Sequence, residues 1–407
     1  MADMRLAIID GVRTPFCKMG TDLAALSADE LGRIAVSALL ARTGFDPALV
    51  DEVIIGCVCQ PFDAANIARV IALRAGIPEH VPAATVNRNC ASGMESLTAA
   101  AERMAAGRGS VFIVGGTESM TNVPLLYTQE AAKKFAKLHK AKSAAESLAA
   151  MARFRVSDFH PRVGLQMGLT DPVSGLNMGE TAELLARENG ITREMQDAFA
   201  HRSHERAVAA ADAMAAAICP VYASGGAITR DNGPRTDSST AGLAKLRTVF
   251  EKYGTVTAGN SSQVTDGAVS LLVMSEARAA ELALKPLGIL THYAYTGCDP
   301  ARMGLGPVSA IAEASKRAGL TLDDADIVEI NEAFAAQVLA VLRQVPVPAE
   351  KLNVNGGAIA LGHPVGATGA RLVLTALHEL RRRNARRALV SLCIGGGQGA
   401  ALWLERN

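Results

Sequence analysis

Two stretches of the chain, TGFDPALVDEVIIG at residues 43–56 and AGLTLDDADIVEIN at residues 318–331, align residue for residue without a gap. Glycine, aspartate, valine and isoleucine stand at matching places in both, and each stretch follows a segment with amphipathic helical periodicity. Internal similarity of this kind indicates a duplicated architecture. The chain is therefore predicted to contain two similar halves.

A second pair of segments extends the repeat. CASGMESLTAAAERMAAGRGSVFIVGG at residues 90–116 corresponds to GATGARLVLTALHELRRRNARRALVSLCIGGG at residues 366–397. Each has a glycine-marked turn, a helix, a basic or glycine-containing break, and an apolar strand that ends in glycines. Helices that alternate with continuous apolar strands, here DEVIIG, VFIVGG, DIVEI and ALVSLCIGG, predict parallel sheets covered on both faces. We therefore expect two α/β halves packed together.

The region between the halves has a different character. It holds an Ala/Lys-rich helical stretch, a second helical run and the turn-rich segment SGGAITRDNGPRTDSSTAG. We predict that residues 1–119 with 263–285 form the first half, that residues 120–262 form an insertion, and that residues 286–407 form the second half.

The insertion begins with a basic stretch. Only Glu130 and Glu146 oppose its cations, which are Lys133, Lys134, Lys137, Lys140, Lys142, Arg153 and Arg155. The pattern favours a solvated helix face over a phosphate-binding or membrane-surface role.

Composition bounds the protein class. A chain of 407 residues with 49% hydrophobic residues is long enough to bury a large core. Forty-one Lys and Arg nearly cancel 40 Asp and Glu, and aromatic residues make up 4%, so a nucleic-acid partner is not expected. The chain opens on a predicted strand, without a secretory or organellar presequence, and no apolar run reaches the roughly 20 residues that a membrane helix needs. Seven cysteines, an odd number, suit a reducing compartment, and we expect the cytoplasm.

Cys90 stands between an extended run and a helical segment, in TVNRNCASGMES at residues 85–96. Unpaired N–H groups and the positive end of the dipole at a helix N-terminus favour a thiolate. The alternative is a packed core cysteine, the commoner role for a single cysteine. Core cysteines usually fall inside an apolar element, whereas this one is flanked by Asn87, Arg88 and Asn89. We predict a nucleophile.

A thiolate nucleophile needs a base, and acyl transfer needs donors for the developing oxyanion. His363 lies in the glycine-rich turn NVNGGAIALGHPVGATGAR, at a point of the repeat near-equivalent to Cys90. Cys393 lies at the end of an apolar strand, and Asn331 directly follows another. Each residue alone is more often structural, but together they lie at junctions that two facing halves would bring to one cleft.

Three other patterns are discounted. GGGQG follows the last strand, with no acidic residue about 20 positions further on, so a dinucleotide site is not predicted. Cys57 and Cys59 lack a second pair of ligands, which leaves packing as their role. His201 and His204 do not form H-E-x-x-H and are expected on a polar helix face, so no metal site is predicted.

Several blocks of sequence together resemble the thiolase family, in the family's order and along nearly the whole chain. The blocks are VRTPF, NRNCASGMES, GGTESM, MGETAELLA, GTVTAGNSSQVTDGA, NEAFAAQ, NVNGGAIALGHPVGATGAR and CIGGGQGAA. The resemblance implies an α/β fold of two duplicated halves in layers α-β-α-β-α. It also implies that the insertion serves CoA or substrate binding and oligomer contacts.

The resemblance implies a role for each residue of the set. Cys90 carries the acyl group as a thioester, and His363 takes its proton and later assists the CoA thiol. Cys393 exchanges a proton with the α-carbon of acetyl-CoA. Asn331 holds a water that stabilises the enolate oxygen, and the N–H groups of Cys90 and Gly395 form a second oxyanion hole. Coenzyme A is a substrate, and no permanently bound cofactor is implied.

The resemblance also assigns a substrate pocket. The positions that match its pantetheine and acyl lining are Ser262, Ala258, Met178, Phe250 and Phe334. Asn177 adjoins them and stands where short-chain acetoacetyl-CoA thiolases often have histidine, which argues against strict acetoacetyl-CoA chemistry. Degradative thiolases that partner a hydratase/dehydrogenase often have histidine in place of Asn331, so the subtype stays open.

The implied function is the thiolase reaction of fatty acid metabolism and β-oxidation. It cleaves a short to medium 3-ketoacyl-CoA with CoA, or condenses two acetyl-CoA molecules to acetoacetyl-CoA. A ketoacyl-synthase-like condensing enzyme is one alternative, but it expects histidine in place of Cys393. A non-catalytic lipid- or CoA-binding relative is another, but it would lack Cys90, His363 or Cys393. Expected partners are acyl-CoA and CoA, further copies of the chain as a homodimer or homotetramer, and a hydratase/dehydrogenase subunit.

Overall fold

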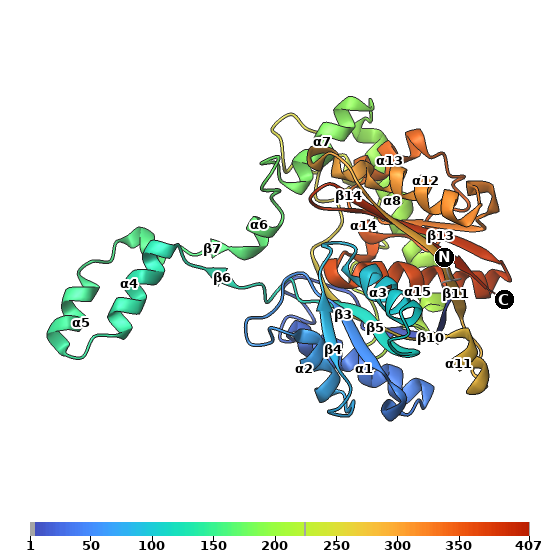
Figure 1. The fold of residues 1–407 in the computed structure, drawn as a ribbon. Coiled ribbons are helices and arrows are strands. Elements are labelled where there is room, and N and C mark those ends of the chain that lie inside the picture. The colour runs from blue at the N-terminus through green and yellow to red at the C-terminus, as the bar shows by residue number, and fades with distance from the viewer. Residues whose placement is uncertain (1–4, 224, 407) are drawn as a thin grey trace. The chain divides into compact units, whose positions relative to one another are not determined.

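The structure is a computed structural model that describes residues 5–223 and 225–406 (Figure 1). The chain divides into two compact units. The smaller unit is Val123–Thr170, and the larger unit comprises the chain before it and from Asp171 onward. The boundaries predicted for the two halves, and the treatment of residues 120–262 as one insertion, stay predictions.

Among the described residues, ten strands form the main sheet of the larger unit. In sheet order they are β12 (Ile327–Ile330), β13 (Arg387–Ile394), β14 (Gln398–Glu405), β11 (Gly288–Gly297), β1 (Leu6–Arg13), β10 (Thr265–Ser275), β5 (Val111–Glu118), β3 (Glu52–Gly56) and β4 (Ala83–Val86), with β2 (Cys17–Lys18) paired to β10. β1 meets β11 only through Leu6, Ala7 and Ile8, and this short pairing joins the two halves.

The prediction of parallel sheets is correct for five strands, since β3 also pairs in parallel with β4, and wrong for the others. The apolar strands found from the sequence form parallel pairs, β3 with β5 and β12 with β13. In contrast, β1, β10, β11 and β14 run antiparallel to their neighbours. The cause is local at β13 and β14, because a tight turn through Gly396 and Gly397, both at positive φ, reverses the chain into a hairpin.

The helices lie in layers about the strands, as the predicted fold requires. α3 (Ser92–Ala105) and α15 (Val365–Arg383) pack against each other, and their apolar residues share one core with strands of both halves (Figure 1). The outer helices are α1 (Ala28–Thr43) and α2 (Ile67–Arg74) on the first half and α12 (Gly306–Ala318) and α13 (Ala335–Gln344) on the second. The α-β-α-β-α order confirms the prediction.

The aligned residues of the repeat do the same structural work in both halves. Gly44 ends α1 and Gly319 ends α12, each in the left-handed conformation that favours glycine. Asp51 accepts hydrogen bonds from the backbone N–H groups that open β5, and Asp326 accepts the equivalent bonds at β13. The repeat in the sequence therefore corresponds to the same helix ends and the same aspartate hydrogen bonds in both halves.

Other elements of the larger unit surround this frame. They are α7 (Met178–Glu188), α8 (Arg193–Ala209), α9 (Ala211–Ala215), α10 (Thr240–Leu243), α11 (Glu276–Glu281) and α14 (Ala358–Leu361), the paired β8 (Val221–Ala223) and β9 (Gly226–Ile228), and 3-10 turns at Pro47–Leu49, Pro300–Leu305 and Leu322–Asp324. In the part of the chain that the structure describes, no helix has both the length and the apolar character needed to cross a membrane.

The smaller unit contains a cluster of aromatic rings, some of them exposed. Its elements are β6 (Leu125–Leu126), α4 (Gln129–His139), α5 (Ala144–Met151), the 3-10 turn Val156–Phe159, β7 (Arg162–Val163) and α6 (Gly164–Gly168). The ring of Phe135 lies 5.1 Å from that of Tyr127 and 4.8 Å from that of Phe154. Lys134 of the basic stretch pairs with Asp158 at 2.6 Å. The role of the remaining basic residues stays a prediction.

Candidate active site

Cys90 lies where the sequence predicts, between the end of β4 and the start of α3. Its turn is held by two hydrogen bonds. Ser92 Oγ accepts from the N–H of Arg88 at 2.9 Å, and Asn89 Nδ2 donates to the carbonyl of Gly395 at 2.8 Å. The second bond crosses from the first half to the turn that follows β13. The segments that carry Cys90 and Cys393 therefore meet.

The two sulfur atoms interact electrostatically. Cys393 ends β13 and is 1% exposed, and burial raises the pKa of its thiol well above the ordinary value. A negative charge on Cys90 raises the pKa further. Cys90, in contrast, is partly exposed. Cys393 therefore stays protonated when Cys90 is a thiolate. A protonated thiol beside the nucleophile is able to act as an acid.

The prediction that Cys90 is favoured as a thiolate is wrong for this structure. Burial raises the pKa of the thiol, and the backbone N–H groups of Gly395 and of Cys90 itself lower it by a smaller amount. Burial outweighs the helix terminus because a charged sulfur loses more water than two N–H groups replace. A base is therefore needed to deprotonate Cys90. The oxyanion role of these two N–H groups stays a prediction.

His363 is held as a neutral base. Its Nδ1 lies 2.6 Å from Oγ1 of Thr368, and that hydroxyl donates its own hydrogen to the carbonyl of Pro364 at 2.9 Å. The hydroxyl must then accept from His363, which puts the ring hydrogen on Nδ1 and leaves Nε2 with its lone pair. Nε2 is buried and bonds no other described group. Burial and the charge of Arg371 lower the pKa of His363 to about 4, so the ring is neutral at physiological pH.

The starts of α3 and α15 adjoin each other. A Cβ on Gly93 would lie 2.7 Å from the backbone nitrogen of Ala370 and 3.0 Å from the carbonyl oxygen of Gly366, an approach that only glycine allows. Cys90 comes just before α3 and His363 just before α15. The predicted nucleophile and base therefore project from neighbouring helix ends.

Asn331 follows β12 with both side-chain polar atoms, Nδ2 and Oδ1, buried and without a partner among the described residues. Its backbone N–H donates to the carbonyl of Ser391, two residues before Cys393, at 3.0 Å. Buried amides normally have partners, so this one is available to a water or a substrate oxygen.

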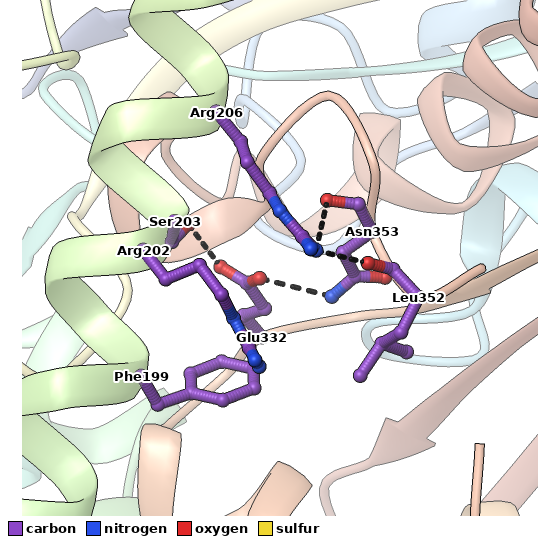
Figure 2. Close-up of a pocket in the computed structure, with 7 residues that line it drawn as sticks. All are labelled: Phe199, Arg202, Ser203, Arg206, Glu332, Leu352 and Asn353. Carbon is purple, nitrogen blue, oxygen red and sulfur yellow. Dashed lines mark hydrogen bonds between the residues drawn. The ribbon is translucent and has the colours of Figure 1, made fainter. Parts of the chain in front are cut away.

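A network behind Asn331 fixes its loop. Glu332 is buried and accepts hydrogen bonds from Ser203 Oγ at 2.6 Å and from Asn353 Nδ2 at 2.9 Å (Figure 2). Asn353 Oδ1 accepts from the N–H of Ile330 at 2.8 Å. Figure 2 shows Arg206 of α8 reaching the same loop, where it donates to the carbonyls of Leu352 and Asn353. Sequence reasoning missed this support because its partners are far apart in the chain.

A groove of about 680 Å³ lies beside the segments that carry Asn331 and His363. Phe250, Ala258 and Ser262, three of the residues assigned to substrate binding, line it. Its wall is bonded to the catalytic segments, because Ser262 N–H donates to the carbonyl of Ala333 and the carbonyl of Gln263 accepts from His363 N–H. The groove therefore reaches the loops that carry Asn331 and His363.

Two predicted pocket residues, Met178 and Phe334, lie around Cys393 in an apolar cluster. The ring of Phe334 meets that of Phe250 at 6.0 Å, which connects this cluster to the groove. Asn177 has a different visible task. Its Oδ1 accepts from Gly179 N–H and Glu180 N–H and so caps α7. A contact of Asn177 with substrate stays a prediction.

Charged residues of the groove were missed from the sequence. Lys18 and Arg235 line it together with His204. His204 is 4% exposed and accepts from the N–H of Arg235 at 3.2 Å, so its placement on a polar helix face is wrong. Burial and Arg235 lower its pKa to about 4. The turn-rich sequence around Arg235 did not predict a place in the groove. Arg235 reaches His204 only when its segment folds against α8.

In residues 5–223 and 225–406, no three His, Cys, Asp or Glu side chains are grouped so that they could hold a metal ion. Cys57 is buried and its thiol donates to a carboxylate oxygen of Glu118 at 3.7 Å.

The chain is similar to known proteins along nearly its whole length. The thiolase N-terminal domain family matches residues 6–277, and the thiolase C-terminal domain family matches residues 284–406. An acetyl-CoA acetyltransferase of Chromobacterium violaceum is 43% identical over 99% of this chain and 100% of that protein. A 3-ketoacyl-CoA thiolase of Serratia proteamaculans is 41% identical over 98% of this chain and 97% of that protein. The crystal structure of human mitochondrial 3-ketoacyl-CoA thiolase in complex with CoA superposes with a TM-score of 0.90 at 38% identity, over 100% of this chain and 99% of that one.

Proposed function

The chain belongs to the thiolase family, and from this premise we propose that Cys90 carries the acyl group while His363 and Cys393 move the protons. The family's reaction is reversible acyl transfer between CoA thioesters, and the chain is an acyltransferase of this kind. One observation carries the residue assignment. Asn89 Nδ2, beside Cys90, donates to the carbonyl of Gly395, two residues after Cys393, at 2.8 Å, which brings the two cysteine-bearing segments together.

The first step forms the acyl-enzyme. Cys90 Sγ attacks the C3 ketone of a 3-ketoacyl-CoA while Nε2 of His363 takes the thiol proton. The N–H groups of Cys90 and Gly395 stabilise the oxyanion. The C2–C3 bond then breaks, the acyl group stays on Cys90 as a thioester, and acetyl-CoA leaves as its enolate.

The second part quenches the enolate and releases the acyl group. Cys393 donates its proton to C2, which yields acetyl-CoA, and the amide of Asn331 supports the enolate oxygen directly or through a water. His363 passes the proton taken from Cys90 to the Cys393 thiolate and is neutral again. It then deprotonates the thiol of CoA, which attacks the thioester; the Cys90 sulfur leaves, takes a proton from His363, and acyl-CoA departs. The condensation of two acetyl-CoA molecules follows the same steps in reverse.

The groove suits a CoA ester. Its lining offers Phe250 and Leu246 to a pantetheine and acyl chain and Lys18 to a phosphate group; Arg235 also lines it and is paired with Asp237 at 2.9 Å. We propose short to medium 3-ketoacyl-CoA as substrates, bound without any permanently held cofactor.

Steady-state assays test this function. The protein is expected to cleave both acetoacetyl-CoA and 3-ketooctanoyl-CoA when CoA is present, and to form acetoacetyl-CoA from acetyl-CoA in reverse, as followed by chromatography of the CoA esters. Failure to cleave either substrate with CoA would favour the non-catalytic alternative. Condensation that requires a decarboxylating malonyl donor would favour the ketoacyl-synthase alternative, against which the thiol at Cys393 argues.

Thr368→Val is expected to lower kcat by about 10- to 100-fold with KM for acetyl-CoA nearly unchanged, because the isosteric change removes the acceptor that holds the ring hydrogen on Nδ1 of His363. The control is Thr368→Ser, which keeps the hydroxyl and should restore most of kcat. Equal rates for the valine and serine variants would contradict the tautomer assignment.

We propose that the protein is a homodimer or homotetramer in the cytoplasm. The strand β4 supports self-association, because it ends the sheet order and, among the described strands, pairs only with β3. Sedimentation velocity distinguishes these states. A hydratase/dehydrogenase partner stays part of the proposal and would be detected as a mixed complex in the same experiment.

A further inference from the structure

Glu118 is a buried carboxylate that the proposed mechanism does not use. It ends β5 and is 0% exposed. Its Oε1 accepts from the N–H of Cys59 at 2.9 Å and from the thiol of Cys57 at 3.7 Å. Its Oε2 accepts from the N–H of Val58 at 3.1 Å and from the N–H of Gly366 at 2.9 Å. All four partners donate to the carboxylate, and these bonds favour its ionised form against burial, which raises the pKa of Glu118 above its ordinary value.

One of these bonds serves the helix that follows His363. α15 begins after Pro364, whose side chain has no acceptor, and no side-chain cap is present at this end. The first N–H groups of a helix need partners from elsewhere. Glu118 supplies one by accepting from Gly366, and it does so from the opposite half of the molecule. A negative charge at this end also suits the helix dipole.

The backbone around this bond leaves no room for another arrangement. A Cβ on Gly116 would lie 1.9 Å from the carbonyl oxygen of Gly366. A Cβ on Gly366 would lie 2.7 Å from the carbonyl oxygen of Thr117 and 3.0 Å from Oε2 of Glu118. The first turn of α15 therefore rests directly on the end of β5, and the carboxylate sets its position.

The other bonds serve the segment that leads to Cys90. Cys57 N–H donates to the carbonyl of Val86, and the carbonyl of Val58 accepts from Asn87 Nδ2 at the outer limit of a hydrogen bond, 3.5 Å. Val86 ends β4, and Asn87 opens the turn that holds Cys90. Glu118 therefore bonds residues 57–59, which hold the chain ahead of Cys90, and Gly366, which lies in the first turn of the helix after His363.

We propose that Glu118 is a positioning residue that sets the placement of His363 relative to Cys90. It bonds Gly366 at the start of the helix after His363, and it bonds residues 57–59, which in turn hold Val86 and Asn87 ahead of Cys90. The inference rests on the proposed function, which assigns base and nucleophile to these residues. A second effect follows from the charge, since Glu118 raises the pKa of the Cys90 thiol after burial has raised it.

Two substitutions separate position from charge. Glu118→Gln keeps the shape but removes the charge and sets an NH₂ group against N–H donors. We expect kcat for thiolysis to fall ~100-fold, as for a small displacement of reacting groups, with KM for CoA changed less than twofold. The pKa of Cys90, followed by the pH dependence of its iodoacetamide alkylation, should fall. Glu118→Asp keeps the charge but shortens the reach, so kcat should fall while this pKa stays raised.

The matched control is Asp51→Asn. Asp51 also accepts two backbone N–H groups of β5, at the end of the strand away from the site. The Asp51→Asn variant should have a lower melting temperature, with kcat and the alkylation profile of Cys90 unchanged. The inference is overturned if both Glu118 variants keep wild-type kcat, or if Glu118→Gln leaves the Cys90 pKa unchanged. Should Glu118→Gln fail to fold, the kcat of Glu118→Asp decides. An inactive wild-type protein would refute the proposed function instead, and the alkylation profiles would still test the placement of Glu118.

Discussion

Cys90→Ala is expected to lower thiolysis and condensation by at least about 10⁴-fold, because without the thiol no acyl-enzyme can form and only binding and oxyanion contributions remain. The measurement is the steady-state rate with acetoacetyl-CoA and CoA. Cys90 is partly exposed and does not itself have a positive φ, although its neighbour Asn89 does, and alanine keeps the Cβ of cysteine. The melting temperature should therefore stay close to that of the wild type.

The control for Cys90 is Cys219→Ala. Cys219 is a free buried thiol at 7% exposure, in contact with the Arg13 segment rather than with the site. Its replacement should cost some stability and leave the rate unchanged. Substantial turnover by Cys90→Ala would mean that another group accepts the acyl chain.

Cys393→Ser is expected to divide the reaction into its two parts. Serine is far too weak an acid to exchange a proton with C2 of acetyl-CoA, so condensation and cleavage should fall by about 10³-fold. Acyl transfer between acetyl-CoA and Cys90 needs only His363 and the N–H groups of Cys90 and Gly395. Exchange of labelled CoA into acetyl-CoA should therefore stay within about tenfold of the wild-type rate.

A second variant on the same strand tests whether this split is specific. Ser391 lies two positions before Cys393, and its hydroxyl donates to the carbonyl of Ala400. Ser391→Ala removes that hydroxyl. It should slow both parts equally or neither. If Cys393→Ser loses exchange and condensation to the same degree, Cys393 is not a selective acid, and its role would be limited to packing around Cys90.

The duplicated frame could be predicted because its signals are local. Gly44 and Gly319 end helices wherever the chain lies in space, and continuous apolar runs such as VFIVGG require cover on both faces. The junctions that hold Cys90 and Cys393 followed from the same pattern. The antiparallel strands did not, because β1 and β10 are paired by residues more than 250 positions apart and no short pattern records that pairing.

The details of the site depend on contacts between distant segments. Thr368 is ordinary in sequence, and its effect on His363 requires both its bond to the ring and its bond to Pro364. Glu118 accepts the N–H of Gly366 only when α15 of the other half packs against β5. The ionisation of Cys90 was predicted with the wrong sign because a helix terminus can be read from the sequence, whereas the depth of burial cannot.

The central claim is that the acyl group is carried by Cys90. Its most direct test is the mass of the peptide between Arg88 and Arg103 after the wild-type protein is mixed with acetyl-CoA, quenched in acid and digested with trypsin. The account predicts that this peptide gains one acetyl group at Cys90 and loses it when free CoA is added before the quench. An acetyl group found on a different residue, or an unmodified Cys90 peptide from a protein that turns over, would contradict it.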